Sequence, residues 1–462
     1  MSGHSATPQQ EIAMFEFPAV FYSDVRIEKV FRSLIRIEMG KLEEVKEKSE
    51  AGAFIRLYDG KRWYYASTTD ISSVNSELSQ LAKLAAAADQ KAIAKLTARM
   101  EKNNGDFCSF TSQSVAKTSL QDKITLLESY ADLIKNDSEI THWSASYSDS
   151  HICKDIYSSL ATDANAGLHF DTQTAGLRLG IRFGSDANVF SETWCKAETG
   201  FEQLKQLQAE AKKYIEQARD YFHRAENIEG GVYTVILSPL AAGIFAHESF
   251  GHKSEADFMI GDAAMLKEWQ LGKKVGSEHL SIIDDGNLAG SGFTPFDDEG
   301  TRAKRTPLIE KGVLRGRLHS SVTAADLDEA VTGNARSISF EFEPIVRMTA
   351  TYIEPGQISK DELFAGVERG IFIDSVKHGS GMSTFTLAPS MAYLIENGKI
   401  TKPVRFSVIT GNVMQTLDHI DAVSDKLEIL SFVGGGCGKM EQYPLPVSFG
   451  GPYVRVNQIN VQ

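Results

Sequence analysis

The sequence predicts an α+β protein made of two domains. Its 462 residues exceed what one ordinary hydrophobic core accommodates. Segments with helical periodicity lie mostly before residue 228, whereas the later segments are short, strand-like and separated by turn residues. We therefore expect an N-terminal helix-and-sheet domain over residues 20–228 and a C-terminal, mainly antiparallel β domain over residues 229–462 that carries one short helix.

In the N-terminal half, predicted helices precede and follow a predicted sheet along the sequence. Four apolar residues recur at helical spacing and predict a first helix over residues 24–48: Val30, Leu34, Ile37 and Leu42. Alternating residues on both sides of Asp59-Gly60 predict a hairpin. Strong helix formers or amphipathic spacing predict further helices over residues 76–100, 122–135 and 202–227. Short runs of β-branched and aromatic residues predict an antiparallel sheet over residues 140–197.

The C-terminal half begins with a strand that leads directly into the short helix. VYTVIL, residues 232–237, is typical of a buried strand, and Ser238 and Pro239 suit the cap and first position of a helix. The helix is expected to end or deform at Gly251. We place the domain boundary at Gly230-Gly231; a loop inside one larger domain is the alternative.

The end of this helix holds a candidate metal site. HESFGHKSEAD places His247 and His252 five positions apart, with Glu248 after the first, whereas the familiar helical zinc motif spaces its histidines by four. In a regular helix, positions five apart point roughly 140° away from each other, so both imidazoles could not reach one ion. A π-turn or a break at Gly251 would bring them together. The alternative is a surface helix end with solvated His and Glu.

A cysteine in an unusual backbone offers a third ligand. FVGGGCGKMEQ places Cys437 among four glycines, which permits close approach to an ion or a bound peptide. Two histidines and one cysteine with an open fourth position form a known catalytic zinc set. A small buried cysteine in a glycine turn is the alternative.

Several stretches together resemble the TldD/PmbA family of metallopeptidases. They follow the family in order from about residue 230 to the end: HESFGHKSEAD, FDDEGTRAKRTPLIEKGVLRGRLH, TGNARS, PIVRMTATYIEPG, YLIENGKITKPVR, ITGNVMQTL and GGGCGKMEQYPLPVSFGGP. The retained His-Glu-x-x-x-His resembles the TldD branch, because PmbA-type (TldE) partners lack it. An older label, modulator of DNA gyrase, also belongs to this family.

The resemblance implies a site, a substrate class and a partner. His247, His252 and Cys437 would bind zinc, and Glu248 would be the general base. The substrates would be small unfolded peptides. The chain would form a homodimer, or a heterodimer with a PmbA/TldE-like subunit. The competing hypothesis is a non-catalytic peptide-binding or assembly subunit with a structural metal site, for which Glu248 would have no use.

Bulk properties argue against other partners. A formal net charge of −13 without a Lys/Arg-rich run disfavours nucleic acid. The most apolar stretch, YTVILSPLAAGIFA, is shorter than a membrane span and contains Ser-Pro, so no membrane insertion is expected. The N-terminus lacks the pattern of a signal peptide, and the four cysteines form no Cys-x-x-Cys pair. A cytoplasmic location and reduced thiols are therefore predicted.

Weaker candidates lie outside this set. Glu255 and Asp257 could orient an imidazole, or they could be a solvated pair. His319 could stabilise an oxyanion, although a satisfied core or surface histidine is favoured. FDDEG, residues 296–300, is expected to be an exposed turn. Three further histidines show no spacing that suggests chemistry: His142, His151 and His169.

Overall fold

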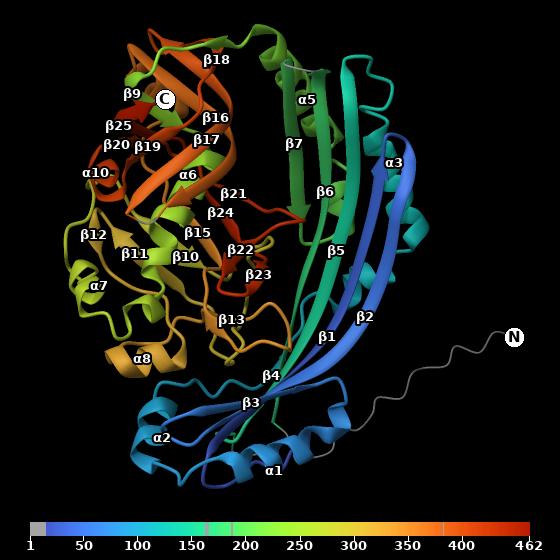
Figure 1. Ribbon diagram of the computed structural model, residues 1–462, viewed down its shortest axis with the longest axis vertical. Coiled ribbons are helices and arrows are strands. Elements are labelled where there is room, and N and C mark those ends of the chain that lie inside the picture. The colour runs from blue at the N-terminus through green and yellow to red at the C-terminus, as the bar shows by residue number, and fades with distance from the viewer. Residues whose placement is uncertain (1–14, 162–165, 186–187, 382) are drawn as a thin grey trace, which may run out of the picture.

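The computed structural model describes residues 15–161, 166–185, 188–381 and 383–462 and shows an α+β architecture, as predicted (Figure 1). A sheet of long strands from the N-terminal half stands beside a strand-rich C-terminal half. Within the described ranges, no helix combines the length and apolar character needed to span a membrane. The four cysteines are free thiols, as expected.

The N-terminal half is built on a seven-stranded sheet in the order β3-β2-β1-β5-β6-β4, with β7 also paired to β6. Its strands are β1 (Tyr22–Glu38), β2 (Lys41–Tyr58), β3 (Trp63–Thr68), β4 (Gly105–Phe107), β5 (Ile140–Ser158), β6 (Leu168–Ser185) and β7 (Asn188–Glu198). Its helices are α1 (Val74–Leu84), α2 (Gln90–Thr97), α3 (Leu120–Ala131), α4 (Phe201–Leu204) and α5 (Gln208–Arg224). Short 3₁₀ turns cover Ile71–Ser73 (η1), Thr111–Gln113 (η2) and Val115–Lys117 (η3).

The helix predicted over residues 24–48 is wrong, because this segment forms β1 and the start of β2. Burial alternates with period two near the end of β1: Ile35 and Ile37 are buried, and Arg36 between them is exposed. Met39 and Gly40 both adopt positive φ, at 47° and 83°, and form the tight turn of a hairpin. The buried face of β1 also carries charged residues, such as Arg26 and Glu28. Because these charges interrupt the alternation of apolar residues, the remaining apolar residues have the spacing of a helix.

For the other N-terminal predictions, the type of each element is confirmed, but some of the predicted boundaries are wrong. α3 overlaps its predicted range but begins two residues earlier and ends four residues earlier. β2 and β3 form the hairpin around Asp59-Gly60, and β5, β6 and β7 form the antiparallel sheet. The helix predicted over residues 76–100 is two helices, because the Asp89 carboxylate accepts the backbone N–H groups of Lys91 and Ala92 and begins α2. The helix predicted over residues 202–227 is likewise divided into α4 and α5.

The C-terminal half contains two larger sheets and is mainly antiparallel, as predicted. One sheet contains β10 (Ile282–Asp285), β11 (Arg305–Glu310), β12 (Val313–Leu314), β15 (Ala350–Ile353), β21 (Glu428–Leu430) and β24 (Ser448–Gly451). The other contains β8 (Glu226–Asn227), β9 (Gly231–Leu237), β16 (Arg369–Gly381), β17 (Thr384–Glu396), β18 (Lys399–Arg405), β19 (Ile409–Asn412), β20 (Ile420–Val423) and β25 (Val454–Val461). In this second sheet β16, β9, β25, β19 and β17 close into a ring, because β17 also pairs with β16.

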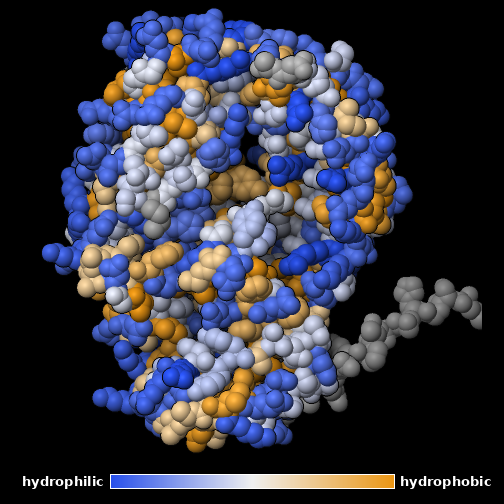
Figure 2. All heavy atoms as spheres, in the orientation of Figure 1, coloured by the Kyte–Doolittle hydropathy of each residue, from blue (hydrophilic) through white to orange (hydrophobic). Residues whose placement is uncertain are grey.

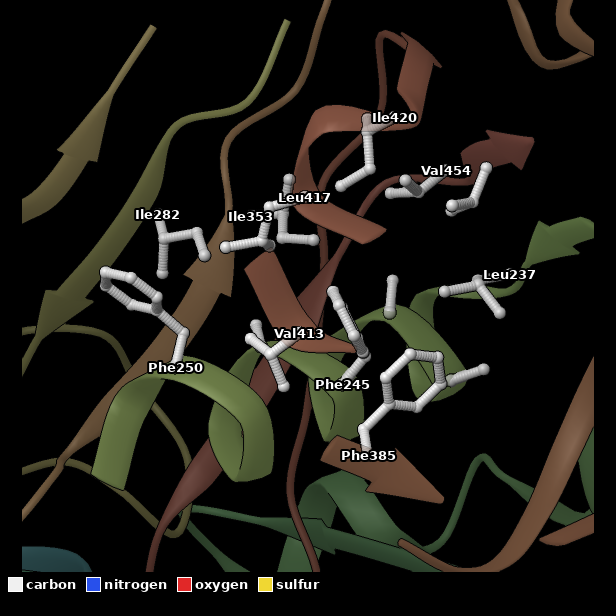
Figure 3. Packing of buried hydrophobic residues seen from close by; sticks show 14 of the residues in the cluster. Leu237, Phe245, Phe250, Ile282, Ile353, Phe385, Val413, Leu417, Ile420 and Val454 are labelled. Carbon is white, nitrogen blue, oxygen red and sulfur yellow. The ribbon is translucent and has the colours of Figure 1, made fainter. Parts of the chain in front are cut away.

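Smaller elements complete this half. Two short hairpins are β13 (Ala335–Arg336) with β14 (Ile345–Val346) and β22 (Cys437–Lys439) with β23 (Gln442–Leu445). The helices are α6 (Pro239–Ala246), α7 (Ala263–Glu268), α8 (Ser321–Leu327), α9 (Lys360–Ala365) and α10 (Val413–Asp418). Helix α6 lies in the apolar core, where Phe245 and Phe250 point among side chains of both larger sheets (Figure 3). This packing fixes the short helix that carries the candidate site.

Buried charges and a shared apolar cluster join the two halves. FDDEG is not the exposed turn that was predicted: Asp297, Asp298 and Glu299 are 1%, 4% and 8% exposed. Asp298 pairs with Lys154 of β5, and Glu299 pairs with Arg56 of β2 at 2.9 Å. The acidic residues are buried because cations of the N-terminal sheet neutralise them.

An apolar cluster continues this junction. It contains buried side chains of β5–β7 and α5 together with Ile236, Phe372 and Tyr393 of the C-terminal half. The boundary placed at residues 228/229 stays a prediction.

Candidate metal centre

The helix that carries the histidines begins as predicted and then becomes irregular. The Ser238 hydroxyl accepts the backbone N–H of Ala241 at 3.2 Å and caps α6, with Pro239 at its first position. A π-turn, His247–Gly251 (η4), follows, and the backbone N–H of His252 donates to the carbonyl of His247. A 3₁₀ turn, His252–Ser254 (η5), then ends the helix. The predicted irregularity between the two histidines is confirmed.

The π-turn brings the two imidazoles to one side of the helix. The rings of His247 and His252 lie 5.1 Å apart between centroids, at 80° to each other. The thiol of Cys437 comes from β22, and its Sγ lies 3.5 Å from Nε2 of His252. One donor atom from each of the three residues lies within 4.8 Å of the other two. Cys437 thus meets His247 and His252 at one point, although it lies 185 positions after His252 in the sequence.

The neighbours of His252 hold its ring in a defined orientation. Its Nδ1 faces Oε2 of the fully buried Glu255 at 3.3 Å, which leaves Nε2 directed toward Cys437. Glu255 also pairs with Lys439 at 3.0 Å. Asp257 contacts Lys439 at 2.7 Å rather than an imidazole. Of the two weaker acidic candidates, Glu255 therefore contacts His252 directly, whereas Asp257 forms an ion pair with Lys439.

The Cys437 thiol and the His252 imidazole stabilise each other's charged forms. Burial opposes ionisation of the Cys437 thiol, but hydrogen bonds and charge from His247 and His252 outweigh it and lower the pKa of the thiol to about 5. Burial disfavours a charged His252, but hydrogen bonds to Cys437 and Glu255 outweigh it and raise the pKa of the imidazole to about 10.

One nitrogen of His247 is free to bind an ion. The Nδ1 atom of His247 is buried and has no hydrogen-bond partner within the described structure. A buried polar atom without a partner is costly unless something binds there. Two imidazoles and a thiolate form a donor set that fits zinc.

The glycines around Cys437 serve different needs. Gly434 has φ +74°, a conformation that side chains rarely adopt. A Cβ on Gly436 would lie 2.4 Å from the carbonyl oxygen of Leu445, so only glycine fits there. Gly435 has open space around it. Arg347 completes the support by donating to the carbonyl of Cys437 at 2.7 Å.

A pocket of about 440 Å³ opens at the three donors. Its walls include His247, Glu248, His252 and Cys437 from the C-terminal half and Arg178, Thr193 and Cys195 from β6 and β7. The molecule is visibly hollowed between its two halves (Figure 2). Glu248 therefore lines the same pocket as the candidate ligands, between the long-stranded sheet and the glycine-rich segment.

Comparisons with known proteins identify the family of the chain. The PmbA/TldA metallopeptidase C-terminal domain matches residues 230–462, and domain 1 of the same metallopeptidases matches residues 23–89. A metalloprotease of Synechocystis is 31% identical over 459 residues, which is 97% of this chain and 96% of that protein. The chain belongs to the PmbA/TldD family of metallopeptidases. The predicted family resemblance is confirmed.

Further relatives and solved structures fit this PmbA/TldD assignment. A zinc metalloprotease TldD homolog of Saccharolobus solfataricus is 36% identical over 50% of this chain and 52% of that protein. A Thermotoga maritima protein described as a modulator of a DNA gyrase has the same fold, with a TM-score of 0.75, 21% identity and 96% of each chain covered. TldE from Thermococcus kodakarensis also shares the fold, with a TM-score of 0.73, 15% identity, and 95% of this chain and 96% of that chain covered.

The remaining histidines of this PmbA/TldD member have other surroundings. His319 is buried, and its two ring nitrogens contact Thr323 and Glu329, so it is the satisfied core histidine that the sequence favoured. His142 pairs with Glu38 and His169 with Asp155. His151 was not expected to matter, yet it contacts Cys153 and Asp171. The signal for it was the spacing of His151 and Cys153, which places both on one face of a strand.

Proposed function

We propose that this PmbA/TldD member is a zinc-dependent peptidase in which His247, His252 and Cys437 hold the ion and Glu248 is the general base. The observation that carries the proposal is the meeting of two imidazoles and a low-pKa thiol in a pocket that Glu248 also lines. A purely structural metal site needs no carboxylate beside its first ligand.

The protein groups have separate tasks in peptide hydrolysis. Zinc, when bound, supplies a Lewis acid that polarises a peptide carbonyl and lowers the pKa of water. A carboxylate oxygen of Glu248 takes a proton from the attacking water and returns it to the nitrogen of the departing amine. The Cys437 thiolate contributes negative charge to the donor set, and Glu255 keeps Nε2 of His252 directed toward the thiolate.

The proposed substrates are unfolded peptides. The pocket lies between the N-terminal sheet and the glycine-rich segment, so an extended chain fits more easily than a folded domain. A larger hollow of about 580 Å³, also walled by both halves, lies beyond the β22–β23 hairpin and would hold the flanking part of a peptide. The net charge of −13 disfavours nucleic acid as an alternative substrate.

We infer that the chain works as a dimer in the cytoplasm, either with a second copy or with a TldE-like subunit. The shared fold with TldE of Thermococcus kodakarensis supports a partner of this kind. Sedimentation of the purified chain alone, and mixed with a TldE-like subunit, tests the assembly. An active species that sediments only as a monomer would contradict it.

The alternative is a peptide-holding subunit without catalysis. Four variants compared by zinc content and kcat on an unfolded peptide separate the two functions. Glu248→Gln keeps the size and polarity of the side chain, so zinc should stay bound while kcat falls by roughly 10²-fold or more. His247→Ala, His252→Ala and Cys437→Ser should each lose zinc and activity together.

Glu441→Gln is the matched control, because this exposed carboxylate lies on the β22–β23 hairpin. It should keep both zinc and turnover. If Glu248→Gln kept near-normal turnover, Glu248 would not be the general base. If the wild type bound zinc and cleaved no unfolded peptide, the holding function would be favoured.

A further inference from the structure

A second cluster of metal-binding side chains lies in the N-terminal sheet, remote from the candidate catalytic pocket. His151 and Cys153 are two residues apart on β5 and therefore share one face of the sheet. Asp171 of β6 lies directly opposite Cys153 in the antiparallel register. Lys154, which points to the other face, pairs with Asp298 of the C-terminal half. The cluster thus faces away from that half and is independent of the proposed peptidase function.

The three donors are as close together as those of the candidate catalytic site. Nε2 of His151 lies 3.0 Å from Oδ2 of Asp171 and 3.7 Å from Sγ of Cys153. One donor atom of each residue lies within 4.8 Å of the others, the same limit that the His247, His252 and Cys437 donors satisfy. Asp171 is fully buried and His151 is 8% exposed, so these side chains are held by the surrounding protein.

The groups behind the donors fix their orientation. The Asp171 carboxylate accepts the backbone N–H groups of Ser109 at 2.6 Å and Phe110 at 3.0 Å. The Nδ1 atom of His151 lies 2.8 Å from the Ser114 hydroxyl, which leaves Nε2 directed at Asp171 and Cys153. Support of this kind, in which a hydrogen bond holds the far side of His151 and of Asp171, is typical of protein metal sites.

The thiol of Cys108 lies near the cluster and is hydrogen-bonded to Asp106. β4 pairs in parallel with β6, with Phe107 opposite Phe170, so Cys108 follows next to Asp171. Burial, a hydrogen bond with Asp106, and the charges of Asp171 and Cys153 raise the pKa of the Cys108 thiol to about 12. A cation bound among these groups would reverse that trend and favour the thiolate. Cys108 is exposed, which leaves the cluster open to ions from solvent.

We propose that His151, Cys153 and Asp171 form a second binding site for a borderline-soft divalent cation such as zinc, with Cys108 as the fourth donor. An imidazole, a carboxylate and thiolates suit zinc better than calcium or magnesium, which prefer oxygen ligands alone. The ion would tie β5 and β6 to the segment between β4 and α3, because Cys108, Ser109, Phe110 and Ser114 all lie in that segment.

The test measures metal at this site alone, in a full-length chain that lacks two ligands of the catalytic candidate, His247→Ala/Cys437→Ser. After loading with zinc and dialysis, this chain should retain one equivalent. Loaded with Co²⁺, it should show the near-ultraviolet charge-transfer absorption of a thiolate–cobalt bond. Adding Cys153→Ala should abolish both signals, and Cys108→Ala should weaken them.

Cys195→Ala is the matched thiol control, since this cysteine lies on β7 outside the cluster. It should leave the metal content of the doubly substituted chain unchanged. Circular dichroism on each variant checks that the fold persists. Failure of the doubly substituted chain to retain zinc or cobalt, or retention after Cys153→Ala, would mean that His151 and Asp171 are only a hydrogen-bonded pair. Either result would leave the proposed peptidase site untouched, because the wild-type activity assay addresses that site separately.

Discussion

At the scale of single residues, Gly251 is required by space rather than by conformation. Its φ of −55° and ψ of −53° are ordinary helical values. A Cβ at this position, however, would lie 2.1 Å from Sδ of the buried Met348. Gly251→Ala should therefore displace the π-turn, lower thermal stability and weaken zinc binding, although no ligand is changed. Zinc affinity and melting temperature measure the effect.

Met348→Ala provides the control for this explanation. It removes the side chain that a new methyl group would meet, so the double variant should lose less stability than the two single variants summed. A coupling of about 0.5–3 kcal/mol is the usual range for residues in contact. Gly435→Ala is the matched glycine control, because nothing lies within 4 Å of its added Cβ. Additive losses in the double variant would show that the requirement for glycine is not steric.

Asp374 makes stability depend on pH. Burial raises the pKa of this β16 carboxyl to about 6, although Gln217 donates a hydrogen bond to it at 2.6 Å. Because the folded-state pKa lies above the unfolded one, the stabilisation is present below about pH 4 and is lost as the pH rises through about 6. Asp374→Asn keeps an acceptor for Gln217 and should exceed the wild type in stability by on the order of 1–3 kcal/mol at pH 8.

Denaturant unfolding at two pH values tests this dependence. The gain of Asp374→Asn should disappear at about pH 3, where the wild-type carboxyl is protonated in both states. Glu216→Gln, an exposed change on α5, should be neutral at both values. An equal gain at both pH values would exclude titration of Asp374 as the cause.

At the scale of elements, the sequence correctly predicted the helices and strands whose local residue pattern agrees with the way they pack in the fold. The strand β9, the cap at Ser238 and the irregular helix after it were predictable, since each depends on residues that are neighbours in sequence. The β1–β2 hairpin was missed because Arg26 and Glu28 are buried in it. Charges at buried positions break the alternation that identifies a strand, and their partners lie in distant parts of the chain.

Lys439 connects the two elements that carry the proposed zinc ligands. It lies on β22, two residues after Cys437, and its ammonium group contacts Glu255 and Asp257, which follow the histidines. Lys439→Met should leave the carboxylate of the buried Glu255 without its main cation, costing about 3–5 kcal/mol of stability. Zinc affinity should fall as well, because Glu255 also orients His252.

The positioning role of Lys439 has a readout that a general loss of stability does not share. In Lys439→Met fully loaded with zinc, kcat should stay close to that of the wild type, because Glu248 is unchanged. Lys426→Met removes an exposed lysine and should leave stability and zinc affinity as they are. A drop in kcat at full zinc occupancy would place Lys439 in the chemistry instead.

At the scale of the whole molecule, the junction between the halves could not be predicted. FDDEG has the composition of an exposed turn, and its burial depends on Arg26, Arg56 and Lys154, which are contributed by strands far away in sequence. Likewise the His151, Cys153 and Asp171 cluster depends on the register of β5 against β6. The proposed ligands His247, His252 and Cys437 could be predicted from the sequence, because they lie in recognisable local motifs.

The junction should control how the pocket is formed. Arg56 contacts Asp24 within its own sheet at 2.7 Å and Glu299 of the other half at 2.9 Å. Arg56→Met leaves these buried carboxylates without their cation and should cost about 3–5 kcal/mol. Arg32→Met breaks an exposed pair with Glu50 on the same sheet and should cost less than about 1 kcal/mol.

The functional consequence follows from the composition of the pocket, whose N-terminal wall contains Arg178 and Thr193. Because the proposed peptide-binding pocket includes this wall, Glu299→Gln should loosen the junction and raise KM for an unfolded peptide. Zinc content should stay at the wild-type level, because the three proposed ligands belong to the C-terminal half. Glu368→Gln, an exposed change in that half outside both hollows, is the control. Steady-state kinetics with parallel zinc analysis distinguishes the outcomes. Loss of zinc in Glu299→Gln would show that the junction supports the metal centre itself, whereas an unchanged KM would show that the N-terminal sheet takes no part in holding the peptide.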